Sequence, residues 1–401
     1  MLFRVLLLIS LSFLSLSAST TYGYEQVKQQ SVLSAFDVDY SFLHNRDFQD
    51  VLKHKQQAHI SRFFAKKLQN AYLFLPMMQE TIANSTLPEE FLFLAMAESG
   101  FSVDAHSHKR ASGPWQFMSA TGKKYGLHID EYVDERRDLV KSTQAAVTYL
   151  EELHQRFDKW YLAALAYNCG EGCVLRAIKR AQTDDLETLI DPSKKYLPRE
   201  TRNYIRKILA FAMVASDAEF THLLNRAKAN SIVGVDVVRG ERVSRVAKML
   251  GMKVSELKRL NSHLCHDFVP PYDEKYTLYI PASKLGEFNQ KYSPSALVEY
   301  YISYRVKAGD NLSKIGKKYR VKYSLIQDFN DLEDTRLKIG QKLIIPVDAT
   351  TDLKNGQYTV KKGDSLISIA RAYKISTEKL KKINNLKGSL IRIGERLSIY
   401  D

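Results

Sequence analysis

One glutamate stands out among the residues that could do chemistry, because it follows an almost wholly apolar helical stretch. Phe91, Leu94 and Ala95 recur at helical spacing, and Glu98 falls next on the same face. Burial among apolar residues would raise the pKa of its carboxyl group, which suits a general acid near neutral pH. A glutamate that reaches into solvent from a helix end would have the same spacing. The spacing alone leaves both interpretations open.

The element that positions Glu98 is predicted to be one short helix between Thr86 and Gly100. Thr86 and Glu89 form a capping-box pattern, and Pro88 falls in the first turn, where its missing N–H costs nothing. Gly100 is a typical helix stop. We therefore expect this helix to deliver a single carboxyl group into a cleft.

Four short motifs around and after this glutamate follow one another along the chain. They are Glu98-Ser99-Gly100, the run from Gly113 to Met118, Ala166-Tyr167-Asn168, and the run from Pro198 to Tyr204. Their order resembles the catalytic domain of the soluble lytic transglycosylase family, and within it the membrane-bound lytic murein transglycosylase D type. The resemblance covers about residues 72–215. It implies a lysozyme-like, all-α domain that cleaves the MurNAc–GlcNAc β-1,4 bond of peptidoglycan.

The resemblance also implies how the bond is broken. Glu98 would act first as the general acid and then as the base, while the 6-hydroxyl of the muramic acid closes on its own anomeric carbon and leaves a 1,6-anhydro end. Most glycosidases instead use two carboxyl groups. A hydrolytic muramidase would need a second carboxylate, for which Asp104, Glu171 and Glu200 are candidates. The family pattern gives Glu200 a binding or supporting role.

Seven further residues are expected to line the glycan cleft, carried over motif by motif from the family. Amide and hydroxyl groups bond the acetamido and ring oxygens of sugars, and aromatic rings cover their apolar faces. The seven are Ser107, Gln116, Met118, Tyr167, Asn168, Glu200 and Tyr204. For Tyr167 and Asn168 a helix end packed in the core is the alternative, and Trp115 is expected to be structural.

A third function, a wall-binding scaffold that has lost activity, is disfavoured because Glu98 and Gln116 are retained together with Tyr167 and Asn168.

Charge and the first residues of the chain indicate where the protein works. The 401 residues carry a net charge of +14, and no nucleic-acid motif is present, so an anionic cell wall is the expected partner. Residues 1–19 contain Arg4, the apolar run Val5–Leu16 and then small residues, which is typical of a secretory signal peptide. An uncleaved membrane anchor is the alternative. No cysteine follows for lipid attachment, so we expect a periplasmic, wall-associated monomer without a lipid anchor.

The C-terminal part repeats itself without a gap. The pattern around Gly309-Asp310 returns 54 residues later around Gly363-Asp364, and each unit reads as strand, two short helices and strand. Asp310 and Asp364 are predicted to cap the first helix of each unit. Both units resemble LysM modules, which bind glycans that contain N-acetylglucosamine.

A weaker copy precedes these two units. The segment 232–285 has the same plan, but Glu241 follows Gly240 where the modules have Asp, and residues 263–273 intrude. We interpret it as a degenerate LysM-like segment whose sugar binding is an open question. The predicted fold class is α+β multidomain. Its expected parts are 1–19 signal peptide, 20–71 helical N-terminal segment, 72–225 lysozyme-like domain, 232–285 LysM-like segment, and LysM modules at 302–348 and 356–401.

The three cysteines could form a disulfide or contribute to a metal site. Cys169 and Cys173 flank a flexible glycine turn in a compartment expected to be oxidising, so a disulfide and two buried thiols are both open. His263, Cys265 and His266 suggest a metal, but no fourth ligand lies nearby in the sequence. We expect neither a metal nor a cofactor.

Overall fold

The computed structural model describes residues 26–55, 57–130, 132–217, 220, 223–225, 231–270, 275–294, 300–319, 321–330, 332–347, 357–360, 364–373, 375–386, 388–392 and 394–399. The predicted signal peptide lies outside these residues. The chain divides into two compact units, Met1–Val233 with Pro281–Ser283, and Gly234–Ile280 with Lys284–Asp401. None of the described helices has the length and apolar character needed to cross a membrane.

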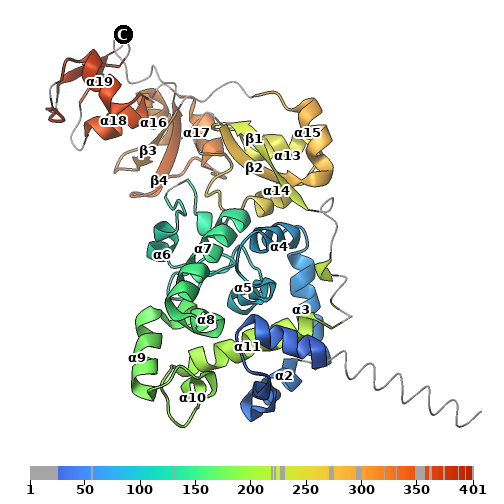
Figure 1. Cartoon of the computed structure of the whole chain (residues 1–401). Coiled ribbons are helices and arrows are strands. Elements are labelled where there is room, and N and C mark those ends of the chain that lie inside the picture. The colour runs from blue at the N-terminus through green and yellow to red at the C-terminus, as the bar shows by residue number, and fades with distance from the viewer. Residues whose placement is uncertain are drawn as a thin grey trace, which may run out of the picture. The chain divides into compact units, whose positions relative to one another are not determined.

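The first unit is helical (Figure 1). After a helical stretch at 26–35, its elements are η1 (Tyr40–His44), α2 (Arg46–Lys55), α3 (Ala58–Asn70), α4 (Leu75–Ala83), η2 (Glu89–Phe91), α5 (Leu92–Ser99), α6 (Ser119–Lys124), η3 (Glu135–Arg137), α7 (Leu139–Phe157), α8 (Trp160–Cys169), α9 (Glu171–Ala181), α10 (Leu186–Ile190) and α11 (Arg199–Ala215). Helix α11 packs against α2, α5 and α8, and α7 packs against α4 and α8. The short helix α5 itself packs against α11, α4 and η2.

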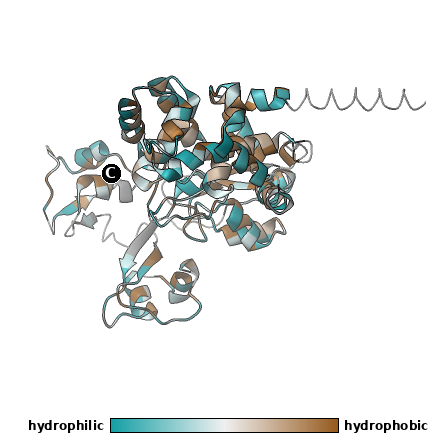
Figure 2. Ribbon diagram, turned by 90° about the horizontal axis from the view of Figure 1, so that it is seen from below, coloured by the Kyte–Doolittle hydropathy of each residue, from teal (hydrophilic) through white to brown (hydrophobic). Residues whose placement is uncertain are grey.

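Hydropathy explains which helices are central and which are peripheral. All six residues Leu92–Ala97 of α5 are buried, as expected for a helix that is apolar on every side. In Figure 2 hydrophilic and hydrophobic segments alternate along the outer helices, which therefore bury one face only. The N-terminal helices pack on this core: Arg206 of α11 pairs with Asp47 of α2 at 3.0 Å, and Lys28 donates to the carbonyl of Ser216 at 2.6 Å.

The start of the helix that carries Glu98 differs from the capping-box prediction, which is wrong. Thr86 donates its hydroxyl and its backbone N–H to Glu151 of α7, at 2.7 and 2.9 Å, and not to a residue of its own helix. The chain then passes through the 3-10 turn η2 before α5 begins at Leu92. The predicted stop is confirmed, because Gly100 has a φ of 62° and its N–H bonds the carbonyl of Met96.

The second unit contains three small modules of the same plan. Their elements are β1 (Ile232–Val238), α13 (Val243–Met249), α14 (Val254–Leu260) and β2 (Lys275–Pro281), followed by η5 (Ala282–Lys284) and α15 (Leu285–Lys291); β3 (Tyr300–Arg305), α16 (Leu312–Tyr319), α17 (Tyr323–Phe329) and β4 (Lys342–Val347); and β5 (Gln357–Thr359), α18 (Leu366–Ala372), α19 (Thr377–Ile383) and β6 (Arg396–Ser398). Each module has one two-stranded sheet, β1–β2, β3–β4 or β5–β6. The predicted α+β organisation is confirmed.

One asparagine closes each of these modules in the same way. Asn261, Asn330 and Asn384 each follow the second helix. The side-chain amide of each donates to the last turn of that helix and to a carbonyl of the second strand, and its oxygen accepts the N–H of the same strand residue, at 2.6–2.9 Å. The degenerate segment therefore keeps the internal clamp of the two regular modules.

The predicted helix caps in the regular modules are wrong by one residue. Asn311 and Ser365 accept the N–H three residues on, at 2.8 and 3.1 Å. Asp310 instead accepts the hydroxyl of Tyr304 at 2.7 Å, and Asp364 accepts the hydroxyl of Tyr358 at the same distance. Each aspartate thus ties the first strand of its module to the turn before the first helix.

Candidate active site

Glu98 lies at the end of α5, half-buried, with its carboxyl group held by another helix. The hydroxyl of Tyr204 on α11 donates to its Oε1 at 2.5 Å. Burial raises the pKa of Glu98 to about 7, and the nearby charge of Glu200 raises it further, whereas the Tyr204 hydrogen bond and the positive charge of Lys207 act in the opposite direction. At neutral pH a large fraction of this carboxyl group therefore carries a proton.

Helix α11 carries three side chains that change the pKa of this carboxyl group. Glu200, Tyr204 and Lys207 are spaced four and three residues apart and so share one helix face. Lys207 donates its ammonium to the carbonyl of Ala97, directly before Glu98. Burial and the charge of Lys55 lower the pKa of Lys207. Lys207 is not among the residues predicted from the sequence, although its position three residues after Tyr204, on the same helix face, is a signal that points to it.

Tyr167 and Trp115 connect α8 to the loop that follows Gly100. Tyr167 donates its hydroxyl to the carbonyl of Trp115 at 2.7 Å, and burial together with the charge of Glu98 raises its pKa. The indole of Trp115 is 0% exposed and donates to Thr143 of α7 at 2.9 Å. Trp115 is therefore a structural residue. Tyr167 lies close enough to Glu98 for the charge of Glu98 to raise its pKa.

The loop between α5 and α6 is held in shape by its own polar side chains. Gln116, at a φ of 50°, donates its amide to the carbonyls of Ala105 and Gly113 at 3.2 and 2.8 Å. Ser107 accepts the N–H of Ala111 at 2.9 Å. A Cβ on Gly113 would lie 1.8 Å from the carbonyl oxygen of Arg136, so only glycine fits there.

The remaining residues of the predicted cleft come from the ends of two helices and one loop. Met118 is 45% exposed, which is unusual for methionine. Asn168, near the end of α8, accepts the hydroxyl of Thr201 of α11 at 2.8 Å, and Glu200 is exposed at the start of α11. The structure thus brings Tyr167, Glu200 and Tyr204 close to the carboxyl group of Glu98. Ser107 and Gln116 hold the adjoining loop.

The other two carboxylates considered for a two-carboxyl mechanism are engaged elsewhere. Asp104 pairs with Arg137, and Glu171 pairs with Arg156 at 2.5 Å. Of the three candidates, Glu200 alone contributes to the pKa of Glu98. Any second acidic function beside Glu98 would therefore fall to Glu200.

A disulfide lies next to Asn168. Cys169 and Cys173 are bonded and close the turn between α8 and α9, which resolves the choice that the sequence left open. Cys265 is exposed and outside this disulfide. Across the described ranges, no group of three or more His, Cys, Asp or Glu side chains is arranged to hold a metal ion.

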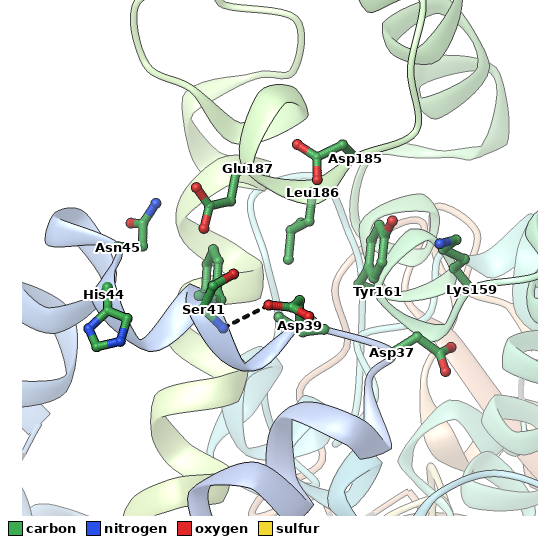
Figure 3. A pocket seen from close by; sticks show the side chains of 12 residues that line it. Asp37, Asp39, Ser41, His44, Asn45, Lys159, Tyr161, Asp185, Leu186 and Glu187 are labelled. Carbon is green, nitrogen blue, oxygen red and sulfur yellow. Dashed lines mark hydrogen bonds between the residues drawn. The ribbon is translucent and has the colours of Figure 1, made fainter.

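A cavity of about 550 Å³ lies in the same unit but does not include Glu98. Figure 3 shows Asp185 and Glu187 across from Asp39, with Asp37 below Tyr161 in this view. Asp37, Asp39 and Asp185 each accept a backbone N–H at 2.7–2.9 Å. Because most of its acidic groups already stabilise local structure, we assign this cavity no function.

Family models match most of the described chain. Residues 76–190 match the model described as Transglycosylase SLT domain, residues 304–346 and 358–399 match LysM domain, and residues 232–296 match Lytic transglycosylase MltD, LysM-like domain. The last match agrees with the interpretation of 232–285 as a degenerate LysM-like segment.

The chain is also similar to individual proteins. The chain is 29% identical over 343 residues to membrane-bound lytic murein transglycosylase D of Escherichia coli K12, covering 80% of this chain and 74% of that protein. It is 30% identical over 172 residues to N-acetylmuramoyl-L-alanine amidase sle1 of Staphylococcus epidermidis, covering 41% and 49%. The solved 70 kDa soluble lytic transglycosylase of Escherichia coli matches 38% of this chain and 26% of its own, with 20% identity and a TM-score of 0.30.

Proposed function

We propose that this chain, which is a lytic transglycosylase with an SLT-type catalytic domain, cleaves the MurNAc–GlcNAc β-1,4 bond of peptidoglycan with Glu98 as its single acid and base. The observation that carries the proposal is the environment of Glu98. A half-buried carboxyl group with a pKa of about 7 can both give and take a proton near neutral pH. One residue with that property suffices for a reaction in which the same proton donor later acts as the acceptor.

The chemical step follows from this proton balance. Protonated Glu98 gives its proton to the glycosidic oxygen while the bond from that oxygen to the anomeric carbon of MurNAc breaks. The 6-hydroxyl oxygen of the same sugar forms the new bond to that carbon, and its proton passes to the Glu98 carboxylate. The enzyme regains its starting state without water, and the product ends in a 1,6-anhydro ring.

The surrounding residues support each stage. Tyr204 holds Oε1 of Glu98, which fixes the direction in which the other oxygen can reach substrate. Lys207 and Tyr204 both favour the carboxylate, which limits how far burial raises the pKa. We assign glycan contacts to Ser107, Gln116, Met118, Tyr167, Asn168, Glu200 and Tyr204, with exposed Met118 as an apolar contact for a sugar face.

The C-terminal modules support attachment to the same polymer. Two LysM modules beside a catalytic domain raise the effective concentration of the enzyme at the wall without changing its chemistry. The positive net charge favours an anionic wall. We propose a periplasmic, wall-associated monomer that is exported by residues 1–19.

Product chemistry tests the proposal. Purified murein digested by the enzyme should give muropeptides with 1,6-anhydromuramoyl ends, about 18 mass units lighter than hydrolytic ends, because hydrolysis adds one water. Mass spectrometry of fresh digests distinguishes the two. Reducing muramic acid ends would instead support a muramidase that uses Glu200, whose charge raises the pKa of Glu98. No released muropeptide would support a wall-binding scaffold.

A further inference from the structure

Two aromatic residues from different modules of the second unit lie against each other. Phe268 belongs to the loop between α14 and β2, and Phe329 is the last residue of α17. Their ring centroids are 5.0 Å apart with an interplanar angle of 57°. Both side chains are buried, with 1% and 2% of their surface exposed. Tilted ring pairs at this distance are favourable.

Phe329 is not used by the interior of its own module. The apolar cluster that fills this module includes Leu343 and Ile345 but not Phe329. Ile344 is also outside the cluster and only 2% exposed, and strand alternation places it on the opposite face from its two neighbours. The first LysM module therefore buries two large apolar side chains outside its own core.

The second LysM module provides an internal comparison, because it repeats the first one 54 residues later. Ile383 stands at the position of Phe329, and Ser398 stands at the position of Ile344. Both are half-buried only. The two modules share their clamp asparagine and their cores, so the difference is specific to this face.

The LysM-like segment carries the complementary feature where it departs from the LysM pattern. Asp267, 2% exposed, accepts the Ser244 hydroxyl at 2.5 Å and pairs with Arg242 at 3.2 Å. The guanidinium of Arg242 lies over the ring of Phe329, 5.3 Å from its centroid. Backbone bonds from Val243 to Asp267 and from Val269 to Glu241, both 3.0 Å, fix the intruding residues to the first turn.

We propose that the LysM-like segment is a docking platform for the first LysM module, with Phe329 seated against Phe268 and Arg242. The residues that make this segment degenerate are then the ones that hold the neighbouring module. The first module is fixed to the platform, whereas the second module carries Ile383 and Ser398 at the equivalent positions. This role is independent of the catalytic proposal.

Hydrogen–deuterium exchange on the full chain tests the docking, because a substitution in one module can be followed by the amide exchange rates of the module that it contacts. Phe268→Ala should speed amide exchange in α17, which belongs to the other module. Phe329→Ala should speed exchange at residues 264–270. Losing an aromatic pair of ordinary strength predicts an increase of about 2- to 12-fold in each case.

Ile383→Ala is the matched control, since it removes the equivalent residue of the second module. It should leave residues 264–270 at the wild-type rate. Unchanged exchange in α17 for Phe268→Ala, or at 264–270 for Phe329→Ala, would overturn the proposal. Phe329→Ala could also unfold its own module, which fast exchange in α16 would show. In that case exchange in α17 for Phe268→Ala, and exchange at residues 264–270 for the milder Phe329→Leu, test the proposal instead.

Discussion

The hydroxyl of Tyr204 and the carboxyl group of Glu98 are joined at 2.5 Å although they lie 106 residues apart in the chain. The bond ties α5, which carries Glu98, to α11, which packs against it. The same face of α11 carries Lys207, whose ammonium holds the backbone just before Glu98. The protonation of this one carboxyl group therefore depends on the docking of two helices.

Replacing the proposed acid, Glu98, should remove nearly all turnover. Glu98→Gln keeps the size and one hydrogen-bonding oxygen but removes the transferable proton. We expect a loss of about 10²–10⁴-fold in muropeptide release, the usual contribution of a positioned acid–base group. Glu171→Gln, which removes a carboxylate paired with Arg156, should retain nearly full activity. Substantial release by a folded Glu98→Gln enzyme would contradict the assignment.

The pH profile should report the groups around Glu98. The protonated form is the acid, so kcat/KM should fall as pH rises through about 7. Lys207→Met removes a positive charge that favours the carboxylate, so the pKa of Glu98 rises and the falling limb moves to higher pH. Lys207→Arg retains the charge and should move it less. A profile identical in wild type and Lys207→Met would rule out electrostatic control by this lysine.

Two glycines with left-handed backbone should respond differently to alanine. Gly126, at a φ of 83°, has open space where a Cβ would stand, so Gly126→Ala should cost about 1–2 kcal/mol from backbone strain alone. Gly113, at a φ of 82°, would in addition place the Cβ 1.8 Å from a carbonyl oxygen. Gly113→Ala should therefore lower the unfolding midpoint clearly more. Equal midpoints in thermal denaturation would show that the loop yields easily.

The disulfide should matter more for the site than for global stability. It closes a loop between residues four apart, so its entropic contribution is smaller than that of a long-range link. Cys169→Ser with Cys173→Ser should change the melting temperature little, while weakening substrate binding through the adjoining Asn168. Thiol titration of the oxidised, denatured wild type should find one reactive cysteine, and three would refute the bond.

Removing residues 302–401 should separate anchoring from chemistry. The first unit keeps all its helices, so cleavage of soluble glycan strands should persist. Co-sedimentation with insoluble murein should fall, because both LysM modules are gone. Equal sedimentation of the full chain and the truncated chain would reject an anchoring role for the modules.

Local patterns predicted the elements well and their long-range partners poorly. The motif order placed Glu98 and Tyr204 in one predicted site, and the two are joined by a hydrogen bond, while their roles stay predictions. The helix stop at Gly100 is confirmed. The capping box at Thr86 is wrong because Glu151, 65 residues away, offers the threonine a stronger acceptor. The contact of Lys207 with Ala97 and the contact of Phe329 with Phe268 depend on which elements pack together. The spacing of residues within one segment does not specify that packing.

The side chains that α11 places beside Glu98 determine where a fragment of the first unit should end when it is expressed alone. The match to the transglycosylase SLT model ends at residue 190, nine residues before α11 begins at Arg199. A fragment that followed the matched boundary would contain Glu98 but neither Tyr204 nor Lys207, and it would uncover the apolar side of α5 that α11 covers. The smallest fragment worth making therefore extends at least through Ala215, and inactivity of a shorter one would say nothing about the enzyme.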